Sequence, residues 1–357
     1  MDFSEINNEK EKCLYATFNQ DSSCFCIGTD KGFRVYNSYP LKCLIKRDID
    51  GGVGIIEVLN RCNIFSFVGT GSNPKFSTKT VILWDEHQSK AIKDLVLLYD
   101  IKNIKLKRTM IFLICEKNVV VFTMNLEKLD SFKTYQNKNG IFGISLDPKL
   151  NIIAYPSSEI GKIIIKNYDE KKDGKYKTKE INAHQTEITA LVMNYDGTLI
   201  GSASEKGTLI KIFRIKDGCL IQELRRGTEQ AEIYSLAFDF KSLYIACSSN
   251  KGTVHIFNIK NDNIEENEVK NQKSFLGNVA SFIGLQNEYL NSEWSFAKYR
   301  LPSKEKNIIG FNQKNEDSII VITQNGKYFQ SKFDDKIVGE CHTCFEEEIL
   351  KMEVEKK

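Results

Sequence analysis

The chain of 357 residues has a mass of 40.9 kDa, with 41% hydrophobic and 27% charged residues. This balance, with a mean hydropathy of -0.33, is typical of a soluble globular protein and excludes a disordered chain or a membrane span. Fifty Lys and Arg against 47 Asp and Glu leave a formal net charge of only +3. A global basic field that would attract nucleic acid is therefore excluded, and any anion-binding site must be local.

The N-terminal segment is polar and lacks the apolar run of a signal peptide, and no later apolar stretch approaches about 18 residues. We therefore expect a cytosolic protein whose ten cysteines are thiols. Cys341, His342 and Cys344 lie close together, but a structural zinc site needs four ligands and no second Cys/His cluster supplies them. We predict no metal and no other cofactor.

A pattern of short strands separated by turns recurs along the chain. The segment 188–215 reads ITALVMNYDGTLIGSASEKGTLIKIFRI, and the segment 233–259 repeats the pattern as IYSLAFDFKSLYIACSSNKGTVHIFNI. Each contains three runs of alternating apolar residues, which is typical of half-buried strands. Equivalent turns recur at intervals of roughly 39 to 47 residues, the period of WD40-type blades, with one longer interval near the end. They lie at Gly32, Lys79, Asn118, Gly161, Gly207, Gly252 and Gly326.

Seven such units predict an all-β fold, a seven-bladed WD40-type β-propeller that spans residues 1–357 as a single domain. No blade can bury its sheet faces alone, so the seven must stack around an axis. The longer interval predicts an insertion over 260–293 in blade six. Helical periodicity is missing apart from a short predicted helix near 346–354.

Leu224-Arg225-Arg226-Gly227 lies between the fifth and sixth repeats. Adjacent residues on an extended backbone point to opposite sides, so we expect Arg225 and Arg226 to reach into two different clefts. Hydroxyl groups and histidines lie at matching turns of both blades, and with partly protonated histidines they would form two small phosphate cradles. The plainer interpretation is that these groups bond one another within the sheets and that the arginines are solvated. We expect the alternation of the strands to turn Ser202 and Ser248 away from the clefts.

The LRRG tetrapeptide, with SASEKGTLIKIF before it and SSNKGTVHIF after it, resembles the PROPPIN family. These β-propellers bind polyphosphoinositides and include the WIPI autophagy proteins. FNQDSSCFCIGTDKGFRVYN, NPKFSTKTVILWD and SEWSFAKYRLP are similar to the family as well, and they span the chain from the first blade to the last. Many members have Phe before the two arginines, whereas Leu224 resembles the WIPI branch.

The resemblance implies two sites for phosphatidylinositol 3-phosphate or phosphatidylinositol 3,5-bisphosphate on blades five and six. Lys211 stands where relatives often have Arg, which keeps the charge but loses the bidentate fork, so we expect a weaker first site. The first site would use His184, Ser204, Thr208, Lys211 and Arg225, and the second Arg226, Ser249, Thr253 and His255.

The insertion begins with charged residues and continues as the apolar run SFLGNVASFIGL. It resembles the family's long loop in blade six, which enters the bilayer, although packing on the rim of the propeller is an equally supported interpretation. A loop and two head-group sites would bind a membrane surface by avidity. The residues predicted to enter the membrane are Phe275, Leu276, Val279, Phe282, Ile283 and Leu285.

The resemblance also implies a protein-docking surface on the first two blades, where the WIPI branch is associated with a lipid-transfer protein of autophagy. Plain turn chemistry is the alternative explanation of the same residues. They are Asn19, Asp21, Asn73, Pro74 and Lys75.

The chain contains four histidines and neither HExxH nor GxSxG, so we predict that it is not an enzyme. Two hypotheses remain. One is a peripheral effector that recruits autophagy or trafficking proteins to autophagosomal, endosomal or other phosphoinositide-bearing membranes. The other is a WD-repeat scaffold that binds only proteins.

Overall fold

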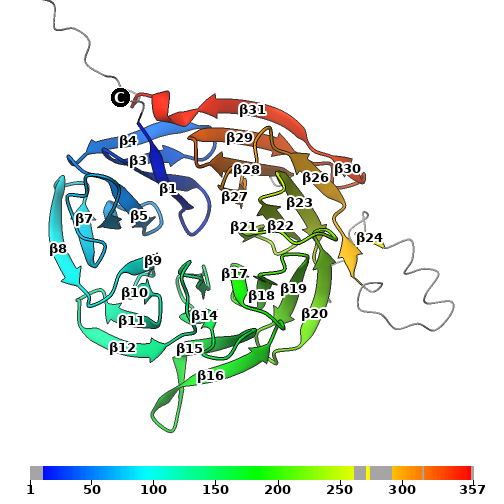
Figure 1. The fold of residues 1–357 in the computed structure, drawn as a ribbon, viewed down its shortest axis with the longest axis horizontal. Helices are drawn as coiled ribbons and strands as arrows, with labels where there is room; N and C mark the ends of the chain where they lie inside the picture. The colour runs from blue at the N-terminus through cyan, green and yellow to red at the C-terminus, as the bar shows by residue number, and fades with distance from the viewer. Residues whose placement is uncertain (1–10, 261–270, 274–291, 316, 355–357) are drawn as a thin grey trace, which may run out of the picture.

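The computed structural model describes residues 11–260, 271–273, 292–315 and 317–354, which form seven β-sheets around a central axis (Figure 1). Each sheet is one blade built on four antiparallel strands, the first nearest the axis and the fourth at the perimeter. Blades five and six each carry additional short strands at the outer edge. The predicted seven-bladed all-β propeller is confirmed.

The first four blades follow one another in the sequence. Their strands are β1 (Cys13–Phe18), β2 (Cys24–Thr29), β3 (Gly32–Asn37) and β4 (Lys42–Asp48); β5 (Val53–Val58), β6 (Ile64–Gly69), β7 (Thr80–Asp85) and β8 (Lys90–Val96); β9 (Ile101–Leu106), β10 (Met110–Cys115), β11 (Asn118–Thr123) and β12 (Lys128–Lys133); and β13 (Gly143–Ile144), β14 (Ile152–Pro156), β15 (Lys162–Lys172) and β16 (Lys175–Asn182).

The last three blades contain the departures from the simple repeat. Blade five has β17 (Ile188–Met193), β18 (Leu199–Ser204), β19 (Leu209–Arg214) and β20 (Leu220–Arg225), extended by β25 (Glu293–Trp294) and β24 (Gln272–Lys273). Blade six has β21 (Ile233–Phe238), β22 (Tyr244–Ser249), β23 (Thr253–Asn258) and β26 (Ala297–Arg300), extended by β30 (Gly339–Glu340). Blade seven has β27 (Asn307–Phe311), β28 (Ser318–Thr323), β29 (Lys327–Lys332) and β31 (His342–Glu348), followed by the 3-10 turn η1 (Ile349–Lys351).

The burial of the strands follows from the stacking of the blades. The second strand of blade three, β10, reads MIFLIC and is buried along its whole length, because neighbouring blades cover both of its faces. The outer strand β12 of the same blade reads KLDSFK and is largely exposed. Apolar clusters therefore lie between consecutive blades, and the outer strand carries charged residues to solvent.

The glycine turns begin the third strands as the repeat predicts. Gly207 has φ +58, and a Cβ atom there would lie 1.8 Å from the carbonyl oxygen of Ala231, so no larger residue fits without a backbone shift. The predicted helix near 346–354 is wrong. The segment forms the end of β31 and the short turn η1, because pairing with β29 overrides the local helical pattern.

Blade one consists only of N-terminal strands, and blade seven only of C-terminal strands. Since the described residues of the two chain ends share no sheet, contacts between side chains close the ring. The hydroxyl of Tyr36 donates a 2.9 Å hydrogen bond to the carbonyl of Ile349, and the hydroxyl of Tyr328 donates a 2.8 Å bond to the carbonyl of Ser38. Phe25 stacks on Tyr36 with ring centroids 4.9 Å apart. No helix within the described residues is long and apolar enough to cross a bilayer.

Candidate anion-binding site

Arg225 and Arg226 lie where the outer strand of blade five ends. Arg225 is the last residue of β20, and both side chains are only 5% exposed. Because adjacent antiparallel strands alternate in direction, the pair shares one side of the propeller with the turns at Gly207 and Gly252 and with His184 between β16 and β17. We call this side the arginine face.

The two arginine side chains have different partners. The Nε of Arg225 donates a 2.7 Å hydrogen bond to the hydroxyl of Ser292. The Nε of Arg226 donates a 2.9 Å bond to the carbonyl of Gly207, and one of its terminal nitrogens donates to the carbonyl of Glu229. Adjacent residues of an extended strand diverge in this way, so the pair serves two separate environments.

The residues of the first predicted set lie on or beside blade five. Ser204 is buried at the end of β18, and its carbonyl accepts a 2.8 Å bond from the backbone of Gly207. Lys211 projects from β19 on the same face of the sheet as Glu223, and its Nζ lies 3.0 Å from that carboxylate. Thr208 is the last residue of the turn between β18 and β19, and its carbonyl accepts the backbone N–H of Arg226 at 2.9 Å.

Ser202 belongs with the first set, contrary to the sequence-based expectation. Its hydroxyl lies 3.0 Å from the Nε2 of His184, in hydrogen-bond contact. Ser202 and Ser204 are two residues apart on one strand, so they share a face of the sheet, and the expectation that Ser202 turns away was wrong. Ser202 is also the register partner of Lys211 across the β18–β19 pair.

His184 and His255 are both neutral at pH 7, so the expectation that partly protonated histidines complete the two phosphate cradles was wrong. Burial, with a smaller contribution from the charge of Lys211, lowers the pKa of His184 to about 4. Burial, together with Lys298 and Arg226, lowers the pKa of His255 to about 3. Both imidazoles therefore act as neutral hydrogen-bonding groups at pH 7, and the positive charge of the site belongs to arginine and lysine.

The residues of the second predicted set lie on blade six, beside Arg226. His255 in β23 is the register partner of Cys247, and its Nδ1 lies 3.0 Å from the hydroxyl of Ser295. The hydroxyl of Ser249 accepts a 3.4 Å bond from the backbone of Lys251. Thr253 begins β23 on the arginine face.

Ser248 faces the other side of β22, as the alternation of the strand predicts. It is buried, and its hydroxyl has no hydrogen-bond partner among the described residues. Its neighbour Ser249 instead lies on the same face as Cys247, the register partner of His255. The two serines therefore belong to different sides of the sheet.

Sequence reasoning missed a segment that reaches both sets. Residues 292–295 span the end of the insertion, and within them β25 pairs in parallel with β20 so that Trp294 is opposite Arg225. Ser292 contacts Arg225, and Ser295 contacts His255. The signal was available, because these residues begin the SEWSFAKYRLP motif, but only the chain's return to blade five gives the two serines this position.

The residues predicted to enter a membrane, Phe275, Leu276, Val279, Phe282, Ile283 and Leu285, lie outside the described residues. Both flanks of that segment are described. Gln272–Lys273 and Glu293–Trp294 form β24 and β25, which pair at the outer edge of blade five (Figure 1). The insertion is therefore anchored beside Arg225.

The residues predicted to dock a protein partner do not come together. Asn19 and Asp21 lie between β1 and β2, on the side opposite the arginine face, whereas Asn73, Pro74 and Lys75 lie between β6 and β7 on the arginine side. Asn19 is buried, and its amide bonds Ser23 and the carbonyl of Asn60. The carboxylate of Asp21 also bonds Ser23, which is the turn chemistry that the sequence left open.

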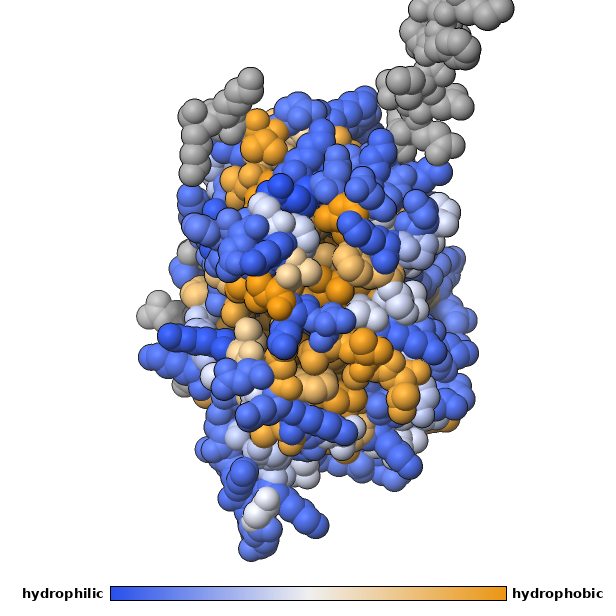
Figure 2. Space-filling view, turned by 90° about the vertical axis from the view of Figure 1, so that its left-hand side faces the viewer, coloured by the Kyte–Doolittle hydropathy of each residue, from blue (hydrophilic) through white to orange (hydrophobic). Residues whose placement is uncertain are grey.

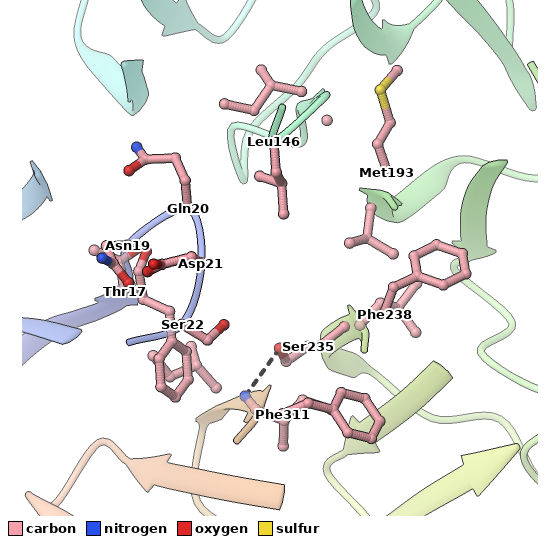
Figure 3. A pocket seen from close by; sticks show the side chains of 18 of the residues that line it. Thr17, Asn19, Gln20, Asp21, Ser22, Leu146, Met193, Ser235, Phe238 and Phe311 are labelled. Carbon is pink, nitrogen blue, oxygen red and sulfur yellow. Dashed lines mark hydrogen bonds between the residues drawn. The ribbon is translucent and has the colours of Figure 1, made fainter. Parts of the chain in front are cut away.

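A cavity of about 300 Å³ opens at the axis on the side opposite the arginine face (Figure 3). Polar residues of blade one, Thr17, Asn19, Gln20, Asp21 and Ser22, line it on one side, and Leu146, Met193, Phe238 and Phe311 face them. Ser235 at its wall accepts a 3.2 Å bond from the backbone of Ile309. Neither Arg225 nor Arg226 lines this cavity, so the central channel is separate from the candidate anion site.

Apolar side chains are exposed along the edge of blades two and three, which faces the viewer in Figure 2. They belong to β8 and to the segment that leads into β9. We call this cluster the apolar edge; it consists of Ile92, Val96, Leu98 and Tyr99, of which Leu98 is 83% exposed.

Within the ranges that the structure describes, no three His, Cys, Asp or Glu side chains gather as a metal site would require. Cys344 near the end of the chain bonds instead to the carbonyl of His342 through its thiol.

A closed seven-bladed propeller with two adjacent buried arginines at the end of the outer strand of blade five defines a β-propeller with a candidate anion-binding site. A family model described as PROPPIN matches residues 12–349, so the chain belongs to the PROPPIN family. The chain is 31% identical over 328 residues to Autophagy-related protein 18e of Arabidopsis thaliana, covering 90% of this chain and 84% of the relative.

Solved structures share the fold. The structure described as Kluyveromyces lactis Hsv2 with complete loop 6CD matches with a TM-score of 0.77 at 22% identity, covering 95% of this chain and 99% of the other. A complex of KlAtg21 with the coiled coil of AgAtg16 matches with a TM-score of 0.68 at 19% identity, with the same coverage. At these identities the likeness shows the fold.

Proposed function

We propose that the protein is a peripheral-membrane effector that binds phosphatidylinositol 3-phosphate and phosphatidylinositol 3,5-bisphosphate through two sites around Arg225 and Arg226. The observation that carries the proposal is the pair of adjacent buried guanidinium groups with different partners. Guanidinium and hydroxyl groups are suitable donors to phosphate oxygens. Membership of the PROPPIN family, whose members bind polyphosphoinositides, supports a lipid head group as the source of the phosphate.

Burial explains why an anion would be bound tightly at the second site. Desolvation lowers the pKa of Arg226, which means that its charged form is held at a disadvantage in the free protein. Its donors meet backbone carbonyls of Gly207 and Glu229, which carry only partial negative charge. A phosphate brings a full negative charge to this position and so compensates the buried cation.

The first site has less positive charge available. Lys211 lies 3.0 Å from Glu223, and both side chains are largely buried, so the carboxylate offsets the charge of the lysine. Arg225 is then the principal cation of the first site. We expect the second site to bind a phosphate more tightly than the first.

Membrane attachment would combine these sites with the insertion. Its apolar residues would supply the hydrophobic share of binding, and each contact raises the effective concentration of the next. The anchoring of β24 and β25 beside Arg225 supports this arrangement, because it brings the insertion and the first site to one edge of the propeller. Under the proposal the protein acts at cytoplasmic surfaces of autophagosomal, endosomal or other phosphoinositide-bearing membranes, recruits other proteins and performs no catalytic step.

The deciding experiment is flotation of the purified protein with phosphatidylcholine vesicles that contain or lack phosphatidylinositol 3-phosphate. We expect flotation only with the phosphoinositide, weakened in Arg225→Ala and in Arg226→Ala and lost in the double variant. Arg300→Ala is the matched control, since Arg300 is an exposed arginine on β26 that pairs with Glu340. Equal flotation of the double variant and the wild type, at unchanged melting temperature, would exclude the proposed sites.

A second candidate function, protein docking, rests on the apolar edge. An exposed apolar strip along an outer strand suits the apolar face of an amphipathic helix. The solved complex of KlAtg21 with a coiled coil supports a helical partner for a protein of this fold. We propose that the apolar edge binds such a helix, and Val96→Asp with Leu98→Asp should abolish helix binding while leaving vesicle flotation intact. Retained binding in this variant would place the docking surface elsewhere.

A further inference from the structure

A network of polar side chains joins the insertion to blade five. Ser292, Gln222, Asn258 and Asn271 are each less than 10% exposed, and Asn258 takes part through its backbone. Asn271 exchanges two hydrogen bonds with the backbone of Asn258, accepting from its N–H at 2.8 Å and donating to its carbonyl at 2.7 Å. Gln222 donates to the same carbonyl at 3.1 Å. Buried amides that are bonded in this way hold the chain in one arrangement.

Glu293 is the centre of this network. Its carboxylate accepts a 2.6 Å bond from Gln222 in β20 and a 3.0 Å bond from Asn271 beside β24, and it pairs with Lys260 at 2.5 Å. These partners come from blade five, from within the insertion and from its beginning. Burial alone would raise the pKa of Glu293, but the bonds from Lys260, Asn271 and Gln222 hold it below its usual value, so the group is an anion.

The residues that flank Glu293 reach the two arginine environments. Ser292 accepts the Nε donor of Arg225 at 2.7 Å, and Ser295 contacts the Nδ1 of His255 at 3.0 Å. A bond to Nε sets the plane of a guanidinium, and a bond to Nδ1 sets the orientation of an imidazole. One short segment therefore aligns a side chain of each predicted site.

We propose that Glu293 is a positioning residue for both anion sites. By fixing residues 292–295 against β20 it holds Ser292 on Arg225 and Ser295 on His255, and it ties the base of the insertion to the same edge. Glu293 does not touch the bound phosphate in this scheme. The effect on ligand binding rests on the proposed function, whereas the effect on Arg225 and His255 does not.

The test compares Glu293→Gln with Glu340→Gln in the full-length protein. Glu340 is a close control, because β30 pairs in parallel with β26 as β25 pairs with β20, and its ion pair with Arg300 is exposed. Without lipid, we expect Glu293→Gln to increase hydrogen exchange at residues 271–273 and 292–295. It should also change the NMR signals of the Arg225 Nε–H and the His255 ring, and Glu340→Gln should change none of these.

With ligand, the probe is soluble inositol 1,3-bisphosphate, which lacks acyl chains and reports the sites without the membrane. We expect Glu293→Gln to weaken its binding about tenfold, because the aligning bonds involve charged groups, and Glu340→Gln to bind like the wild type. Wild-type affinity in Glu293→Gln despite the altered Arg225 and His255 signals would overturn the proposal.

If the wild type itself fails to bind the probe and to float with vesicles, the proposed function fails. The ligand-free signals of Arg225 and His255 then decide the positioning role alone. Ser292→Ala covers the case in which Glu293→Gln does not fold. This variant removes the hydroxyl that accepts the bond from Arg225 and changes no buried charge. It should therefore shift the NMR signal of the Arg225 Nε–H and leave that of the His255 ring unchanged. An unchanged Arg225 signal would contradict the proposed contact between Ser292 and Arg225.

Discussion

The Nε of Arg225 and the hydroxyl of Ser292 are hydrogen-bonded at 2.7 Å although 67 residues separate them in the chain. Arg225 ends the outer strand of blade five, and Ser292 ends the insertion of blade six. The bond thus joins an element of the regular repeat to a segment that interrupts it. The first candidate site is assembled from three separate stretches of chain: His184, which precedes blade five, the strands β18 to β20 with Ser202 and Arg225, and Ser292.

Glu223→Gln should strengthen head-group binding at the first site. The carboxylate of Glu223 offsets the charge of Lys211 at 3.0 Å, and its removal leaves the lysine as an additional cation beside Arg225. We expect the affinity for soluble inositol 1,3-bisphosphate, measured by calorimetry in an Arg226→Ala background, to rise about threefold to tenfold, with stability reduced by about 1 kcal/mol.

Glu180→Gln is the control, because Glu180 forms a similar cross-strand pair with Lys162 on blade four at 2.8 Å. It should leave the affinity unchanged. An unchanged or lower affinity in Glu223→Gln would show that Lys211 does not contribute to the site.

The stability of the protein should fall as the pH is lowered from about 6.5 towards 4, in part because of His255 and His184. Their pKa values are lowered to about 3 and about 4, from an ordinary value of 6.5. Between those values the unfolded chain binds protons that the folded protein does not, so the free energy of unfolding decreases as the pH falls. The contribution is complete above about pH 6.5.

Urea unfolding at a series of pH values measures this effect. His255→Gln should flatten the dependence between pH 6.5 and 4, whereas the exposed His87→Gln should not. The same slope in wild type and His255→Gln would show that His255 is not held neutral by burial.

Gly207→Ala should destabilise the protein and weaken the second site. The residue has φ +58, and a Cβ would lie 1.8 Å from the carbonyl oxygen of Ala231, so the turn that accepts the Nε of Arg226 must shift. Gly174→Ala separates the two causes, since Gly174 has φ +75 but nothing within 4 Å of an added Cβ. We expect a loss of about 1 kcal/mol for Gly174→Ala and a clearly larger loss for Gly207→Ala in thermal unfolding. Equal losses would show that the turn accommodates the methyl group.

The ring closure should depend on two tyrosine hydroxyl groups. Tyr328→Phe removes the donor to the carbonyl of Ser38, and leaving that buried carbonyl unpaired costs about 1 to 3 kcal/mol. Tyr36→Phe removes one of two donors to the carbonyl of Ile349, which keeps the 3.1 Å bond from the backbone of Met352, so we expect a smaller loss of about 1 kcal/mol. Tyr234→Phe is the control, because the hydroxyl of Tyr234 makes only a long 3.4 Å bond in an exposed position. Calorimetric unfolding that is unchanged in both closure variants would show that packing alone closes the ring.

Much of the architecture could be predicted from the sequence because a propeller repeats its local pattern. The turn glycines, the alternating strands and the extra length in blade six each appear in the order of residues. The segment 346–354 shows the limit of this approach. Its local pattern favours a helix, but pairing with β29 makes it the end of a strand followed by a single 3-10 turn.

The candidate site could be predicted in part. Arg225 and Arg226 diverge because neighbours on a strand alternate, which the sequence already implies. The same alternation places Ser202 on the face of the sheet that carries Ser204. It therefore assigns Ser202 to the first site, where its hydroxyl contacts His184. The protonation of the histidines could not be foreseen, since it depends on how deeply the neighbouring blades bury them.

By itself the sequence determined the number of blades, the position of the insertion and the divergence of the two arginines, because each follows from interactions between residues close in the chain. Only the tertiary structure decided that the insertion returns to the edge of blade five, so that Glu293, Ser292 and Ser295 meet Gln222, Arg225 and His255. The physical reason is that these contacts form between residues 40 to 71 positions apart in the chain, and no local periodicity records such a pairing.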